Sequence, residues 1–179
     1  MKTIKSLLFC IIALSFAGCD DDLFDLKFDL NTKDVSFTIP ATSAAGEIIL
    51  DSTTQHINLD SLATEFGADV NNLKSVKITK ITAFIDDPLT ANFDIIKSGE
   101  LFIDGPDLPS KKVASILNPD ADGKREMVIT PEDVDLLEYA RKSSITIAGK
   151  LVTDGPVVEP TRVRLVFAFQ VIANPIKKE

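Results

Sequence analysis

Several residue types that carry chemistry are scarce in this chain of 179 residues, which has no tryptophan, one tyrosine and one histidine. The single histidine, His56, cannot supply a three-histidine zinc site, and we expect it to be an ordinary edge-strand residue. Sugar-binding surfaces rely on Trp and Tyr rings, so the lone Tyr139 argues against a large glycan platform. The chain has neither a Gly-x-Ser-x-Gly turn nor a glycine-rich phosphate loop. These absences predict a protein that is not an enzyme.

Positive charge is also scarce, with 19 Lys and Arg residues against 27 Asp and Glu residues. Proteins that bind nucleic acid depend on Lys and Arg to neutralise phosphates, so we expect no nucleic-acid partner. An anionic surface favours solubility, a cation or a basic protein partner instead.

The first eighteen residues have the pattern of a secretory signal. Lys2 and Lys5 form a basic start, residues 6–16 form an apolar run, and the small residues Ala17 and Gly18 come next. The apolar run is shorter than the roughly 20 residues that a membrane-spanning helix needs. The alternatives are an ordinary signal peptide followed by an incidental cysteine, or an uncleaved membrane helix.

The end of this signal, Phe16-Ala17-Gly18-Cys19, resembles the lipobox of bacterial lipoproteins, with Phe16 where that family usually has Leu. The resemblance implies cleavage before Cys19 and attachment of a diacylglyceryl group, often with a further chain such as palmitate, to Cys19. Two or more acyl chains hold a protein stably on a membrane. The resemblance therefore implies that lipidated Cys19 is the membrane anchor.

Three acidic residues, Asp20 to Asp22, follow the cysteine. They resemble the surface-export signal of Bacteroidota lipoproteins, which implies an outer-membrane protein that faces the cell surface. A periplasmic orientation is the alternative, since an aspartate directly after the cysteine favours inner-membrane retention in enterobacteria. A third interpretation is a solvated tether that keeps the domain away from anionic head groups.

Cleavage would divide the chain into a signal peptide (1–18), an acidic tether (19–23) and one domain (24–179), which is a typical domain size. Loss of Lys2 and Lys5 leaves 17 basic residues against 27 acidic ones, a net charge of about −10. Cys10 would leave with the signal and Cys19 would carry lipid. The domain is then expected to have no disulfide, no thiolate catalysis and no cysteine zinc site.

Short segments of alternating apolar and polar residues, separated by turn signals, predict a mostly β protein with the fold of an immunoglobulin-like antiparallel β-sandwich. The parity of the apolar residues changes near Thr79 and Lys80, which predicts a bulge there. The predicted strands are 24–30, 35–39, 47–52, 55–59, 74–85, 92–96, 100–103, 113–117, 126–129, 145–151 and 161–173.

One short helix is predicted at about 131–142. Thr130 suits the N-cap, Pro131 the first helical position, and Glu132 and Asp133 the positive end of the helix dipole. A second brief helix is a candidate at about 60–66.

One loop is similar to the front half of an EF-hand calcium loop. Asn118, Asp120 and Asp122 have the alternate spacing of oxygen ligands, Gly123 stands at the turn, and Glu126 is a partial substitute for the missing twelfth ligand. Lys124 and Arg125 place opposing positive charge beside it. The alternative to a calcium site at Asn118, Asp120, Asp122 and Glu126 is a plain acidic turn, and no other cofactor is expected.

The expected function is therefore that of a non-catalytic, lipid-anchored β-sandwich of the outer membrane, which contacts other proteins of the cell envelope. The side of the last predicted strand that carries Arg162, Arg164 and Gln170 is a candidate docking surface. One alternative is a calcium- or glycan-binding module. Another is a hydrolase, which would need paired carboxylates across a cleft. Asp86 with Asp87 and Asp133 with Asp135 are expected to be turn or helix-surface residues, and the sequence assigns no catalytic residue.

Overall fold

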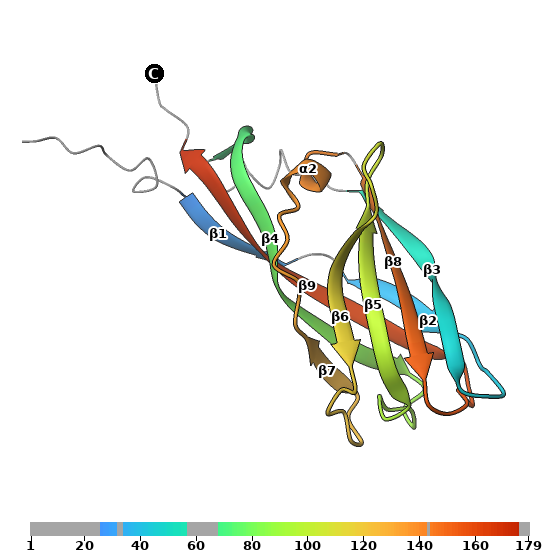
Figure 1. The fold of residues 1–179 in the computed structure, drawn as a ribbon. Helices are drawn as coiled ribbons and strands as arrows, with labels where there is room; N and C mark the ends of the chain where they lie inside the picture. The colour runs from blue at the N-terminus through green and yellow to red at the C-terminus, as the bar shows by residue number, and fades with distance from the viewer. Residues whose placement is uncertain (1–25, 32–33, 57–67, 143, 176–179) are drawn as a thin grey trace, which may run out of the picture.

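The structure is a computed structural model that describes residues 26–31, 34–56, 68–142 and 144–175. Two antiparallel sheets pack face to face (Figure 1), which confirms the predicted β-sandwich. The strands are β1 (Leu26–Asn31), β2 (Val35–Ile39), β3 (Gly46–His56), β4 (Ala68–Asp87), β5 (Ile96–Asp104), β6 (Lys111–Leu117), β7 (Glu126–Ile129), β8 (Ser144–Thr153) and β9 (Thr161–Pro175).

The strand order is that of a jelly roll. The first sheet has the order β1-β9-β4-β7, with β2 also paired to β9, and the second has the order β3-β8-β5-β6. Strands β2 to β9 thus divide into two four-stranded layers, β2-β9-β4-β7 and β3-β8-β5-β6, as in the double Greek key of jelly rolls. This differs from the expected immunoglobulin order, in which seven strands divide as ABED and CFG. Alternating side chains indicate which face of a strand is buried, but they do not identify its neighbours.

Strand β9 is the centre of the first sheet. Its C-terminal half pairs with β1, its N-terminal half pairs with β2, and β4 pairs along its other side. The predicted alternation is present, because Val163, Leu165, Phe167 and Val171 are all buried in the core. One face of this long strand therefore supplies much of the core.

The bulge predicted in β4 is confirmed by a shift in register against β9 between Ile78 and Lys80. The predicted strand 47–52 and the first two residues of the predicted strand 55–59 both belong to β3, whose register shifts between Leu50 and Thr53. Residues 57–59 lie outside the described residues. The strand predicted at 92–96 is wrong over residues 92–95. There the chain turns, because the N–H of Ile96 bonds to the carbonyl of Phe93 at 3.0 Å.

The helix predicted at 131–142 is also wrong over its first half, since α2 covers only Leu137–Ala140. Pro131 forms a bridge with Ala114, and the N–H of Glu132 donates to the carbonyl of Val113 at 2.8 Å. The N–H of Leu136 donates to the carbonyl of Val76, also at 2.8 Å. These bonds to β6 and β4 hold the segment extended, so tertiary contacts outweigh the local helix signals.

Cys19, the acidic tether and the candidate helix at 60–66 lie outside the described residues. Among the residues that are described, no helix is long and apolar enough to cross a membrane.

Candidate functional site

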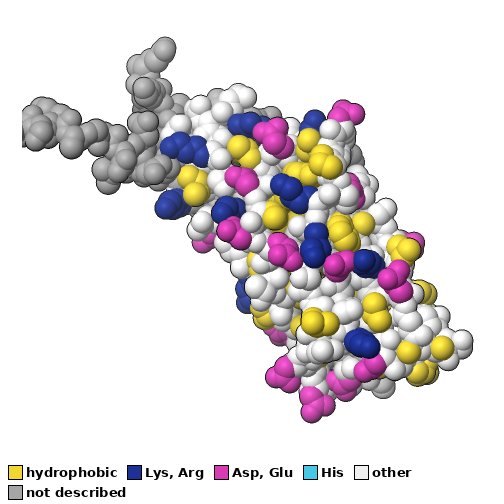
Figure 2. Space-filling view, viewed as in Figure 1, with side chains coloured by type: hydrophobic (Ala, Val, Ile, Leu, Met, Phe, Trp, Pro, Cys, Tyr) yellow, Lys and Arg dark blue, Asp and Glu magenta, His cyan; other side chains and the backbone are white. Residues whose placement is uncertain are grey.

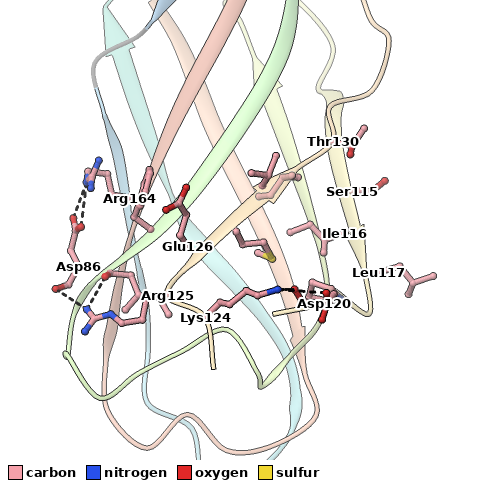
Figure 3. Close-up of a pocket in the computed structure, with 16 residues that line it drawn as sticks. Asp86, Ser115, Ile116, Leu117, Asp120, Lys124, Arg125, Glu126, Thr130 and Arg164 are labelled. Carbon is pink, nitrogen blue, oxygen red and sulfur yellow. Dashed lines mark hydrogen bonds and ion pairs between the residues drawn. The ribbon is translucent and has the colours of Figure 1, made fainter. Parts of the chain in front are cut away.

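A cleft of about 1010 Å³ lies at one side of the sandwich, between the edge strand β6 of one sheet and the edge strand β7 of the other (Figure 3). Strand β6 is the last strand of one sheet and β7 is the last strand of the other. Residues 115–117 of β6 line one wall, and the whole of β7 lines the other. Asp86, Arg125 and Arg164 lie at the far side of β7 in this view.

Strand β7 leaves part of its backbone unpaired. It pairs with β4 in antiparallel register, Ala83 opposite Met127 and Thr82 opposite Val128. The N–H of Ile85 bonds to the carbonyl of Arg125 at 2.9 Å, which fixes the phase of the ladder. Since hydrogen-bonded and non-bonded pairs alternate in such a ladder, Met127 directs its N–H and C=O toward β4. Val128 then directs its N–H and C=O toward the cleft.

Glu126 has the same outward backbone phase as Val128, two residues earlier. No hydrogen bond joins the backbone N–H or C=O of either residue to any other part of the described chain. An open strand edge of this kind is a template for pairing with another chain.

Apolar side chains surround this edge. Leu117 at the end of β6 is 76% exposed and Val128 on β7 is 58% exposed, although both are large and apolar. Ile116 and Met127 are half-buried at the floor of the cleft and pack against the core. Exposed apolar side chains that gather beside a hollow mark contact sites on soluble domains.

Arg125 holds the loop at one end of the cleft. Its guanidinium donates to the carbonyl of Ile85 at 2.8 Å and also to the carbonyl of Leu89. Arg125 thereby ties the end of β4 and the turn at 88–92 to the start of β7.

Arg164 is held just as firmly on the outer face of the first sheet. Its guanidinium lies 3.2 Å from both the Asp86 and the Asp34 carboxylates and 4.6 Å from the centre of the Phe84 ring. The hydrogen bond with Asp86 raises the pKa of Arg164. Of the predicted docking surface, Arg164 is therefore engaged within the chain, Arg162 is exposed and Gln170 is half-buried.

The predicted calcium loop leads into this cleft, but its side chains do not converge. No group of three or more His, Cys, Asp or Glu side chains that could hold a metal ion occurs within the described ranges. The Lys124 ammonium lies 3.5 Å from the Asp120 carboxylate and neutralises it. The N–H of Gly123 donates to Asp94 at 2.7 Å, and the N–H of Asn118 donates to the carbonyl of Lys97 at 2.7 Å.

The remaining ligand candidates separate in space. Asp122 is exposed, and Glu126 begins β7 with its carboxylate at the cleft (Figure 3). Glu126 has no ion-pair partner among the described side chains, in contrast to the cations nearby.

The other carboxylate pairs are engaged within the fold or face solvent. Asp133 forms an ion pair with Lys77 at 2.7 Å, and the Asp135 carboxylate accepts two backbone hydrogen bonds. Asp86 pairs with Arg164, and Asp87 is exposed. Each of these carboxylates therefore has a structural partner or faces solvent.

Tyr139, the one candidate ring for a sugar platform, is buried in α2, where its hydroxyl donates to the carbonyl of Pro109 at 2.6 Å. His56 is the last residue of β3, opposite Ser144, at the outer edge of the second sheet.

The cleft itself was not predicted. The sequence pattern predicts a strand at 126–129, but the place of this strand at a sheet edge depends on pairings between segments that are distant in the sequence. The apolar Leu117 and Val128, each at the outward position of its strand, are the only local signal for it.

Comparison with known proteins adds no further constraint on the site, because no protein-family model matches the chain and no curated protein matches it.

Proposed function

We propose that this chain is a lipoprotein of the outer membrane, anchored through Cys19, whose β-sandwich binds a protein partner in the cleft between β6 and β7. The observation that carries the proposal is an unpaired strand edge flanked by exposed Leu117 and Val128. The lipobox-like signal at Phe16 to Cys19 supports the anchor.

The strand register supports a site held away from the membrane. The described fold begins at Leu26, which lies opposite Ala173 near one end of β9. The β4 residues that pair with β7 lie opposite Leu165 and Phe167, nearer the other end. Eight residues separate Ala173 from Leu165, about 25 Å at the rise of a strand. A partner in the cleft would be presented on the side away from the tether.

The anchor is tested by expressing the full chain and its Cys19→Ala variant in a bacterium that processes lipoproteins. The wild type is expected to associate with the membrane and to incorporate labelled palmitate. The Cys19→Ala variant is expected to be soluble and unlabelled. A wild type found in the soluble fraction without label would contradict the anchor. Protease treatment of intact cells then separates a surface orientation, which predicts digestion, from a periplasmic one, which predicts protection.

The binding site is tested by placing a photocrosslinking amino acid at Leu117 in living cells. The matched control is Ile49, which is 78% exposed on β3 at the opposite edge of the second sheet. A discrete crosslinked protein from position 117, absent from position 49, is expected. Equal crosslinking from both positions, or none from position 117, would remove the cleft as the contact site.

A further inference from the structure

The unpaired edge of β7 indicates what kind of segment the partner supplies. We infer that the cleft binds an extended segment of the partner as an added strand on β7, with a Lys or Arg of that segment beside Glu126. This inference rests on the proposed function, since it concerns how the partner is held at that site.

The first argument is the backbone. Glu126 and Val128 direct their N–H and C=O groups outward at a spacing of two residues, which is the repeat that an added strand matches. A partner backbone in extended conformation supplies donors and acceptors at this repeat, and main-chain hydrogen bonds then give the affinity. A compact apolar ligand would leave these groups without partners.

The second argument is the space beside the edge. An added strand lies about 4.8 Å from its neighbour, which puts it in the cleft between β7 and the end of β6. Its inward side chains would meet Ile116 and Met127, and those on its other face would flank Val128. The segment is therefore expected to carry apolar residues on the face that points to the core, since alternate side chains of a strand point to opposite faces.

The third argument is charge. Lys124, Arg125 and Arg164 line the cleft, but each is already bound to an acceptor within the chain. Glu126 has no ion-pair partner in the described part of the chain. Acidic side chains also gather at the lower end of the domain in Figure 2, and the chain as a whole carries a net charge of −8. A basic residue on the partner segment is complementary to this end of β7.

The same features disfavour a second copy of this chain as the occupant. Two copies would repel each other, because the chain without residues 1–18 carries 17 basic and 27 acidic side chains.

The test removes one outward N–H without touching the ladder to β4. Proline is tolerated on an edge strand where the N–H faces solvent, so Val128→Pro deletes a donor that only an added strand uses. Val128→Thr is the matched control, because it keeps the N–H and a β-branched side chain. The probe is a phage library of random twelve-residue peptides, selected on the full chain held in detergent micelles.

We expect selected peptides to combine alternating apolar residues with a Lys or Arg. Val128→Pro should weaken their binding at least tenfold, Val128→Thr less than threefold, and Glu126→Gln about two- to fivefold, the range for an exposed charge pair. Peptides that bind Val128→Pro as tightly as wild type would overturn the inference. The inference would also be overturned if selection on the wild type gave only peptides that selection on Val128→Pro gives as well.

A second measurement keeps the inference testable if Val128→Pro does not fold. Amide exchange in the wild type should slow at Glu126 and Val128 when a selected peptide is added, and unchanged exchange there would overturn strand addition. Sedimentation that shows a wild-type dimer lost in Val128→Pro and kept in Val128→Thr would make a second copy the occupant, which also overturns it. A partner crosslinked at Leu117 but unaffected by Val128→Pro would leave the proposed function standing and remove only strand addition.

Discussion

The carboxylate of Asp135 accepts a 3.1 Å hydrogen bond from the backbone N–H of Val76, a residue of β4 that lies 59 positions earlier in the chain. The same oxygen accepts the N–H of Leu137 at 2.9 Å, which forms an Asx turn at the start of α2. One side chain thus joins the end of an extended segment to the first sheet and starts the only described helix.

Replacing Asp135 should therefore lower stability in a pH-dependent way. Burial raises the pKa of Asp135, but the N–H donors of Val76 and Leu137, together with Ser75 and Lys77, outweigh it and leave the pKa below its ordinary value of 3.8. A lowered folded pKa contributes stability above the unfolded pKa, and this stability is lost as the pH falls through the folded pKa. Asp135→Ala should cost about 1–2 kcal/mol near neutral pH.

Urea unfolding over a descending pH series measures this difference. The gap between wild type and Asp135→Asn should begin to narrow below pH 3.8 and close once the pH falls below the lowered pKa of folded Asp135, because neither side chain then carries charge. Asp133→Asn is the control, since Asp133 is exposed and pairs only with Lys77 at the surface; its effect should be smaller. A gap that is the same at every pH would contradict the charged role of Asp135.

Removing the side chain of Arg125 should release the loop beside the cleft. The guanidinium binds the carbonyls of Ile85 and Leu89, and a charged donor of this kind contributes more than a neutral one. Arg125→Ala should lower the free energy of unfolding by about 1–2 kcal/mol. Arg125→Lys should recover only part of this loss, because an ammonium lacks the planar fork of donors. Amide exchange over residues 85–90 should rise in both variants, most in Arg125→Ala, and unchanged exchange would show that the loop is held by other contacts.

Adding one methyl group at Gly149 should disturb the second sheet. A Cβ atom there would lie 3.1 Å from Leu50 Cδ1 and 3.2 Å from Leu101 Cδ2, side chains of the two strands that flank β8. Overpacking of this kind costs about 1–3 kcal/mol, so Gly149→Ala should lower the melting temperature by several degrees. Gly46→Ala is the matched control, because no atom lies within 4 Å of its added Cβ. Equal melting temperatures for the two variants would show that the leucines give way without cost.

Tyr139 should ionise later in the folded protein than in the unfolded chain. Burial raises its pKa above the ordinary value of 10, and the nearby Asp104 carboxylate adds to the effect. The chain has one tyrosine and no tryptophan, so the near-ultraviolet absorbance of phenolate reports this residue alone. The titration midpoint should lie above 10 in buffer and return to about 10 in denaturant. A midpoint that is equal in both solvents would contradict the burial of the ring, and Tyr139→Phe should abolish the signal.

The sequence predicts those parts of the fold whose pattern is local. Strand β2 has the bounds that were predicted from the alternation of Val35, Phe37 and Ile39, all of which are buried. The bulge near Thr79 was predictable for the same reason, because it reverses the alternation. The helix over 131–142 failed because its helix signals at Thr130 and Pro131 compete with hydrogen bonds to β6 and β4, which no local pattern reports.

The candidate site was less accessible to prediction than the fold. The loop pattern predicts Glu126 as an oxygen ligand of a calcium site, and the structure places Glu126 at the start of an edge strand, β7. Lys124, whose positive charge is expected to oppose a cation, forms an ion pair with Asp120. The role of Val128 depends on which strand is last in its sheet, and that property belongs to the whole topology.

The central place of β9 has a consequence for how the protein reaches its folded state. β1, β2 and β4 all pair with a strand that is synthesised after every other described strand. The first sheet cannot assemble until Thr161 and the residues after it are available, and pairings between such distant segments are slow to form. A chain that emerges from its N-terminal end onward therefore leaves the first sheet incomplete until its last strand, β9, arrives.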